Sequence, residues 1–136
     1  MKNILFVCTG NTCRSPMAMA LFNEYAAKNN IDAVADSAGV AAANGIPASE
    51  NAVKVLAEMD IDLSRHLSKP ISKELLNRAD LIVCMSEGHA EMLKAAGYTS
   101  VVFGQGVADP YGYTVDVYRN CRDSMLEAMP RLVDLL

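Results

Sequence analysis

A cysteine and an arginine near the start of the chain have a spacing that suits phosphate chemistry. Five residues separate Cys8 from Arg14, and Ser15 follows the arginine directly. A thiol beside an arginine at the start of a helix is more readily held as the thiolate, which is its nucleophilic form. An arginine also presents a planar fork of donors that can bind two phosphate oxygens at once. The spacing therefore predicts a nucleophile, Cys8, next to an anion-binding side chain, Arg14.

The residues between these two favour a loop that curls around an anion. Gly10 and Asn11 belong to the residue types that tolerate positive φ angles. Consecutive backbone N–H groups and the following helix N-terminus can then converge on a phosphate group. The nucleotide P-loop is excluded, because it needs a lysine that this segment lacks. The expected phosphate-binding residues are Thr9, Gly10, Asn11, Thr12, Cys13, Arg14 and Ser15.

Phosphoryl transfer to a thiolate also needs an acid that protonates the leaving group. Asp109 precedes a proline in a loop beyond a later predicted strand, and it could act first as this acid and then as the base that activates water. Cys8, Arg14 and Asp109 would suffice without a metal or another cofactor. A zinc site is not expected, because no Cys-x2-Cys pair is present and only His66 and His89 could add ligands.

Hydrophobic patterning indicates that strands and helices alternate along the chain. Short apolar runs predict strands at residues 4–7, 33–38, 81–85 and 101–103. Helical spacing and capping residues predict helices at residues 16–28, 49–59, 72–78, 86–97 and 115–136. Ser15 is expected to cap the first helix, and Pro130 to kink the last helix or end it early. The alternation implies an α/β fold with a four-stranded parallel sheet and helices on both faces.

Length and composition predict one domain spanning residues 1–136. The chain has 136 residues, of which 51% are hydrophobic, and a net charge of −4. This acidic balance argues against nucleic acid as a partner. Four cysteines in a chain long enough to bury a core indicate a reduced protein rather than a disulfide framework. No segment has the length of a signal-peptide core or a membrane span, so we expect a cytoplasmic location and no membrane partner.

Two motifs resemble those of the low-molecular-weight protein tyrosine phosphatases. They are VCTGNTCRSPMA at residues 7–18 and DPYG at residues 109–112, and the resemblance covers essentially the whole chain. It implies a four-stranded parallel sheet and a phosphocysteine intermediate on Cys8. It also implies phosphate binding by Arg14 and the loop amides, with Asp109 as acid and then base. Phosphorylated proteins would be the substrates and inorganic phosphate the product.

The same resemblance implies roles for residues around the loop. A hydrogen-bond network would hold the loop in shape, and its members would be Asn11, Ser15, Ser37 and His66. Tyr111 would line the pocket mouth, although an exposed turn tyrosine is the alternative. Cys13 has two interpretations. It either packs beneath the loop or forms a disulfide with Cys8 on oxidation, which would protect the thiolate from irreversible damage.

Two positions resemble the bacterial protein arginine phosphatases more than the tyrosine-directed members of the superfamily. The residue two before Arg14 is often isoleucine in tyrosine phosphatases, whereas this chain has Thr12. Some tyrosine-directed members carry a second aromatic residue where this chain has Gly112, after Tyr111. Phosphoarginine on proteins is therefore the expected substrate, with its guanidinium paired to Asp109. Phosphotyrosine is the alternative substrate.

Two other functions are less favoured. Arsenate reductases share the loop, but they also resemble one another in a pair of relay cysteines on a mobile segment. Here Cys84 lies within an apolar strand pattern with no cysteine nearby, and Cys121 falls in a predicted helix. A phosphate-binding module without turnover is the other alternative. The presence of both Cys8 and Asp109 argues against it.

Overall fold

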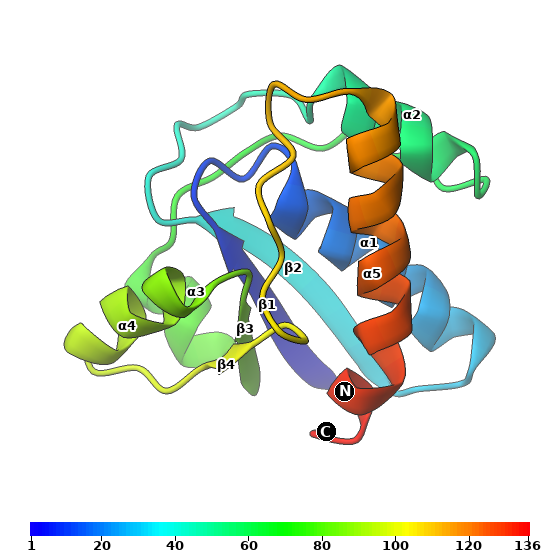
Figure 1. Ribbon diagram of the computed structural model, residues 1–136. Helices are drawn as coiled ribbons and strands as arrows, with labels where there is room; N and C mark the ends of the chain where they lie inside the picture. The colour runs from blue at the N-terminus through cyan, green and yellow to red at the C-terminus, as the bar shows by residue number, and fades with distance from the viewer.

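Four parallel strands form the centre of the computed structural model, which describes residues 1–136 (Figure 1). The strands are β1 (Lys2–Cys8), β2 (Ala33–Gly39), β3 (Leu81–Cys84) and β4 (Val101–Val102), in the spatial order β2-β1-β3-β4. Every pairing between neighbours is parallel. The helices are α1 (Arg14–Lys28), α2 (Glu50–Ala57), α3 (Lys73–Arg78), α4 (Glu87–Ala95) and α5 (Val115–Val133). The predicted α/β fold with a four-stranded parallel sheet is confirmed.

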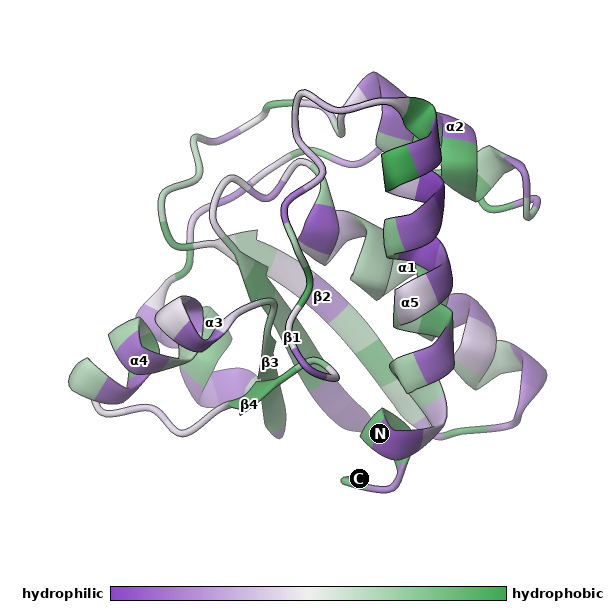
Figure 2. Cartoon of the chain, in the orientation of Figure 1, coloured by the Kyte–Doolittle hydropathy of each residue, from purple (hydrophilic) through white to green (hydrophobic).

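Different helices cover the two faces of the sheet. Residues of α1, α2 and α5 join Ile4 and Phe6 of β1 in a core of 25 buried residues. Residues of α3 and α4 meet Leu5 and Val7 in a second cluster of 7 buried residues on the other face. Successive side chains of a strand point to opposite faces, so β1 supplies both cores. This explains why β1 and β3 carry hydrophobic residues almost continuously, whereas α5 has a hydrophilic and a hydrophobic side (Figure 2).

Most predicted element boundaries agree with the structure to within a few residues. Ser72 and Ser86 are the N-caps of α3 and α4, and each hydroxyl accepts the backbone N–H three residues later, at 3.2 and 3.3 Å. α5 contains Pro130 and ends at Val133, short of the predicted residue 136. None of the helices is both long and apolar enough to span a membrane.

The predicted start of the first helix is wrong. α1 begins at Arg14 with Cys13 in the cap position, and no side chain caps it. Ser15 and Pro16 therefore lie within the first turn, where backbone N–H groups have no intrahelical partner and a proline loses no hydrogen bond. The hydroxyl of Ser15 does not cap the helix because it is engaged with two side chains of the preceding loop, Cys8 and Asn11.

Candidate active site

The loop between β1 and α1 lies at the carboxyl edge of the sheet and lines a pocket of about 380 Å³. Every residue from Cys8 to Arg14 lines this pocket, together with Asp109 and Tyr111 from the loop that precedes α5. Tyr111, expected at the pocket mouth, is 69% exposed. The fold thus brings the expected nucleophile, arginine and acid, which are far apart in the sequence, to one hollow.

The backbone of this loop offers hydrogen-bond donors to the pocket. Asn11 has a φ of 57°, which turns the chain in the way its residue type tolerates. No hydrogen bond within the protein uses the backbone N–H groups of residues 9–13 as donors. A run of unused N–H groups that leads into a helix N-terminus is a typical anion-binding concavity. The loop therefore has the donors that a phosphate group requires.

Cys8 ends β1 with its side chain buried and its sulfur directed at a serine. The Sγ atom lies 2.8 Å from Ser15 Oγ. Asn11 Nδ2 donates to the same Ser15 Oγ at 2.8 Å, so the serine proton is free to be donated to the sulfur. A hydrogen bond donated to sulfur favours the thiolate over the thiol. This arrangement allows the Ser15 hydroxyl to donate its proton to the Cys8 sulfur.

Arg14 is buried and is anchored by three groups. Its Nη1 donates to the carbonyl oxygen of Val107 at 3.1 Å, and its Nη2 donates to Thr9 Oγ1 at 3.5 Å. The Asp109 carboxylate lies 3.6 Å from Nη2, and its other oxygen accepts the N–H of Tyr111 at 3.1 Å. A guanidinium has five N–H donors, so these contacts leave others for a phosphate in the pocket.

The side chains expected to brace the loop are joined by hydrogen bonds through Asn11. Asn11 Nδ2 donates to Ser15 Oγ at 2.8 Å and to Ser37 Oγ at 3.0 Å, and its Oδ1 accepts the Lys69 N–H at 3.0 Å. The carbonyl of Asn11 lies 2.8 Å from His66 Nε2. Burial lowers the pKa of His66, and the bond to Asn11 opposes this only in part. The imidazole is thus neutral at pH 7 and donates its Nε2–H to the carbonyl.

Gly39 supports the loop in a way that the sequence analysis missed. A Cβ atom on Gly39 would lie 2.4 Å from the carbonyl oxygen of Thr9. The N–H groups of Val40 and Ala41 donate to the carbonyls of Cys8 and Thr9, at 2.9 and 3.0 Å. The end of β2 therefore holds the start of the loop at a distance that only glycine permits. A glycine at the end of a predicted strand is the one signal that could have indicated this contact.

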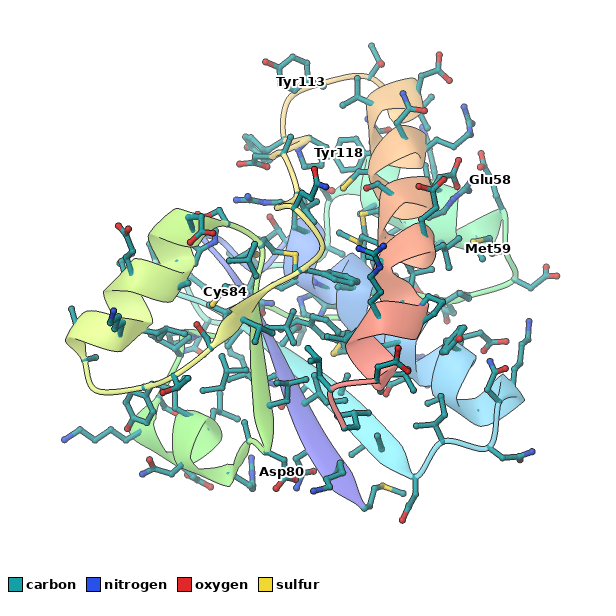
Figure 3. The ribbon with its side chains drawn as sticks, turned by 60° about the horizontal axis from the view of Figure 1, so that its bottom comes forward. Glu58, Met59, Asp80, Cys84, Tyr113 and Tyr118 are labelled. Carbon is teal, nitrogen blue, oxygen red and sulfur yellow. The ribbon has the colours of Figure 1, made fainter.

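Cys13 lines the pocket, and its buried sulfur also packs beneath the loop against two hydroxyl groups. Its Sγ lies 3.3 Å from the hydroxyl of Tyr118 and 3.4 Å from Ser49 Oγ. Tyr118 is on the inner side of α5, whereas Tyr113 lies at the outer tip of the preceding loop (Figure 3). Burial raises the pKa of Tyr118 to about 12, so its hydroxyl stays protonated. All four cysteines are free thiols.

Thr12 and Gly112 are the two positions expected to set the substrate, and Gly112 directly follows Tyr111, which lines the pocket. Thr12 is half-buried and lines it. Gly112 has a φ of 81° within a turn closed by the Tyr113 N–H and the Pro110 carbonyl at 3.0 Å. A turn residue with positive φ strains any side chain that has a Cβ. A second aromatic residue at position 112 would therefore require a different turn.

The two remaining cysteines lie in the interior of the fold. Cys84 is buried in β3 and donates to Ser100 Oγ at 3.5 Å, and Cys121 is buried on the inner face of α5. Burial raises the pKa of both thiols, that of Cys121 to about 12. Neither lies in an exposed segment of the kind that a cysteine relay requires.

The chain is similar to known proteins over nearly its whole length. Residues 3–136 match the family model described as low molecular weight phosphotyrosine protein phosphatase. A protein-arginine-phosphatase of Bacillus subtilis (strain 168) is 38% identical over an alignment of 145 residues, which covers 98% of this chain and 96% of the relative.

Solved structures are similar over the whole chain. A low molecular weight protein tyrosine phosphatase from T. tengcongensis has a TM-score of 0.93 and 38% identity, and the match covers 100% of both chains. A cysteine-to-serine mutant of the YwlE arginine phosphatase, with a phosphorylated active-site serine, has a TM-score of 0.91 and 37% identity. That match covers 98% of this chain and 95% of the other.

Proposed function

This chain belongs to the low-molecular-weight phosphotyrosine protein phosphatase family, and within it we propose that it is a protein-arginine phosphatase. The observation that carries the proposal is the placement of Cys8 Sγ below a loop of unused N–H groups, beside an Arg14–Asp109 pair 3.6 Å apart. These groups supply a nucleophile, an anion cradle and an acid in one hollow. Hydrolysis of a phosphorylated protein side chain needs all three.

In the first half of the reaction the Cys8 thiolate attacks the phosphorus atom in line with the leaving nitrogen. An S–P bond forms and the P–N bond breaks. The loop N–H groups and Arg14 hold the three phosphoryl oxygens and stabilise their charge in the transition state. Asp109 gives its proton to the leaving guanidino nitrogen, so that arginine departs as its guanidinium form.

In the second half water attacks the phosphocysteine. The Asp109 carboxylate takes a proton from the water as its oxygen bonds to phosphorus. The S–P bond breaks, the Cys8 thiolate is restored with help from the Ser15 hydroxyl, and inorganic phosphate leaves. No metal or other cofactor takes part in either half.

Thr12 and Asp109 support a preference for phosphoarginine. The Asp109 side chain is 53% exposed at the pocket, where it can pair with a substrate guanidinium. Thr12 is shorter than isoleucine and adds a hydroxyl to the pocket lining. The relative from Bacillus subtilis (strain 168) described above is itself a protein-arginine-phosphatase.

A direct comparison of two substrates tests this preference. Phosphate release is measured from one peptide that carries phosphoarginine and a matched peptide that carries phosphotyrosine. We expect a higher kcat/KM for phosphoarginine, and a shift toward phosphotyrosine in Thr12→Ile. Thr99→Ile, at an exposed threonine outside the pocket, is the matched control and should leave the ratio unchanged. Faster release from phosphotyrosine by the unmodified protein would overturn the arginine preference and leave the phosphatase mechanism in place.

Two further expectations stay predictions. One is the cytoplasmic location. The other is a Cys8–Cys13 disulfide formed on oxidation. It predicts that activity lost to peroxide returns on treatment with a thiol reductant, and that Cys13→Ser loses this recovery. Permanent inactivation of the unmodified protein by the same treatment would contradict it.

A further inference from the structure

A buried histidine lies directly behind the phosphate-binding loop, on α4. His89 is only 6% exposed, and its ring lies between two hydroxyl groups. Nδ1 lies 2.9 Å from Ser86 Oγ, and Nε2 lies 2.9 Å from Thr9 Oγ1. The same Thr9 oxygen accepts from Arg14 Nη2 at 3.5 Å. A continuous chain of side chains therefore runs from the start of α4 to the guanidinium.

The imidazole of His89 is neutral at pH 7. Burial lowers its pKa most, and the nearby positive charge of Arg14 lowers it further, while Asp109 opposes both. A neutral imidazole has one donor and one acceptor nitrogen. In either tautomer each nitrogen finds a hydroxyl partner, and Thr9 Oγ1 keeps a lone pair for the guanidinium. The ring thus links the two hydroxyls without adding a second positive charge beside Arg14.

At the α4 end of this series of side chains, the position of His89 is fixed. Ser86 caps α4, and its Oγ also accepts the backbone N–H of His89 at 3.3 Å. The residue before it, Met85, donates its N–H to the carbonyl of Val7 at 3.0 Å, which ties the end of β3 to β1. The histidine is therefore held by the sheet and by a helix cap.

The other two partners of Arg14 are less suited to fix it throughout the reaction. The carbonyl of Val107 and the carboxylate of Asp109 both belong to the irregular segment between β4 and α5. In the proposed mechanism Asp109 is protonated when it acts as the acid, and its attraction to the guanidinium falls with its charge. The contact with Thr9 does not change charge at any step.

We propose that His89 is a positioning residue of the phosphatase reaction. It acts through Thr9 Oγ1 to keep the Arg14 guanidinium oriented toward the phosphoryl oxygens. This inference rests on the proposed function and deepens it. His89 does not touch the substrate. Its effect is on the orientation of Arg14, so its loss should destabilise the transition state, and lower kcat, more than it weakens substrate binding.

The test uses a generic aryl phosphate as substrate, so that it does not depend on the arginine preference. We expect His89→Ala to lower kcat about 10- to 100-fold, because small misplacements of a catalytic group have effects of this size, with little change in KM. Thr9→Val should have a similar effect. His89→Gln, which keeps a polar group within reach of Thr9, should recover part of the loss. Glu91→Ala, at an exposed position on the same helix, should retain the kcat of the unmodified protein.

The double variant decides whether His89 acts through Thr9. If it does, Thr9→Val combined with His89→Ala lowers kcat no further than the stronger single variant. Losses that multiply would overturn the proposal. So would an unchanged kcat in His89→Ala, or a loss that follows a drop in Tm equally in the Ala and Gln variants. If the unmodified protein hydrolyses neither the aryl phosphate nor the phosphoarginine peptide, the proposed function falls and this inference falls with it.

Discussion

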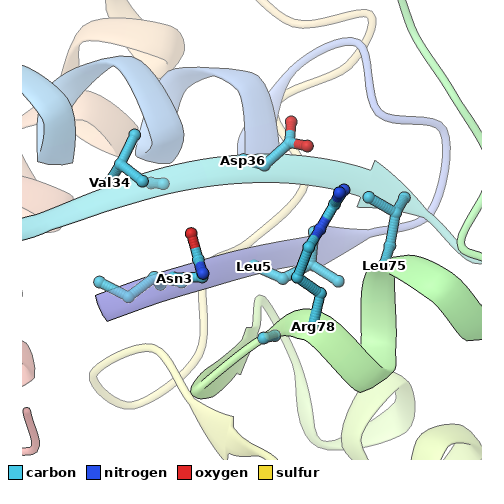
Figure 4. Close-up of a pocket in the computed structure, with 9 residues that line it drawn as sticks. Asn3, Leu5, Val34, Asp36, Leu75 and Arg78 are labelled. Atoms are coloured by element: carbon cyan, nitrogen blue, oxygen red, sulfur yellow. The ribbon is translucent and has the colours of Figure 1, made fainter. Parts of the chain in front are cut away.

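Two hollows of similar size lie at different places on the sheet, and only one is built for chemistry. The hollow at the carboxyl edge has a volume of about 380 Å³ and contains Arg14, whose side chain is 9% exposed. The other has a volume of about 350 Å³ and lies between β1, β2 and α3 (Figure 4). Its arginine, Arg78, is 59% exposed and pairs with Glu74 on its own helix. Volume alone does not distinguish the two.

The difference lies in why each hollow exists. The one in Figure 4 forms because α3 is short and leaves part of β2 uncovered, so that Val34 is 41% exposed. The one at the carboxyl edge forms because a loop holds buried polar groups around a space. Burying an arginine beside a run of N–H groups that have no partner in the protein is unfavourable unless something compensates for the lost water. Such groups mark a site that receives an anion.

The largest expected effect is a difference in kcat/KM between substitutions of the two arginines, Arg14 and Arg78. Arg14→Lys should lower kcat/KM by about 10³-fold, because lysine cannot bridge two phosphoryl oxygens in the transition state. Arg78→Lys should leave kcat/KM within about twofold, as exposed substitutions usually do. Steady-state hydrolysis of an aryl phosphate measures both. Equal effects at the two positions would show that burial of the arginine does not identify the site.

The next effect concerns the acid. Asp109→Asn should lower kcat about 10²-fold, because an amide has no proton to give to the leaving group. Inhibition by inorganic phosphate should be unchanged or stronger, since a negative charge has been removed from the pocket. Asp80→Asn is the control, because Asp80 lies at the opposite end of the molecule (Figure 3). An equal loss of turnover and of phosphate affinity would argue against an acid role for Asp109.

A smaller effect tests whether the loop depends on its close approach to β2. Gly39→Ala should destabilise the protein by about 1–3 kcal/mol, because a Cβ atom would overlap the Thr9 carbonyl. Turnover should fall as the loop shifts. Gly88→Ala is the matched control, since a Cβ atom there would meet only Ser86 Oγ at 3.7 Å. Thermal unfolding and kcat are measured together, and a stable, active Gly39→Ala would show that the loop tolerates the shift.

The sequence could predict the fold and the gathering of the main site residues. Continuous apolar runs identified strands buried on both faces, and the carboxyl ends of parallel strands necessarily meet at one edge. Cys8 and Asp109 both follow such strands, so their proximity follows from the topology. The spacing of Arg14 then indicated an anion site at the same edge.

Other features depend on contacts between distant segments, which no local pattern reveals. Ser15 looked like a helix cap because its type and the following proline favour one, but in the structure its hydroxyl bonds to Cys8 and Asn11 instead. The need for glycine at position 39 exists only because β2 approaches the loop. His89 gave no signal beyond its residue type, because its partner Thr9 is 80 residues away.

The smallest expected effect is a change in how stability depends on pH, through His66. His66 braces the loop, and burial lowers its pKa from the ordinary value of 6.5. As the pH falls through 6.5, the histidine of the unfolded chain takes up its proton before that of the folded chain. The contribution of His66 to stability is therefore present above this pH and is lost below it.

The hollow in Figure 4 has no such histidine among its lining residues. His66→Gln, which keeps an N–H donor for the Asn11 carbonyl but does not titrate, should show a shallower fall of Tm between pH 7 and pH 5 than the unmodified protein. Arg78→Ala should leave that slope unchanged, because arginine stays charged throughout this range. A parallel Tm profile for His66→Gln and the unmodified protein would mean that protonation of this imidazole does not strain the loop, and that the network around Asn11 accepts the charged ring.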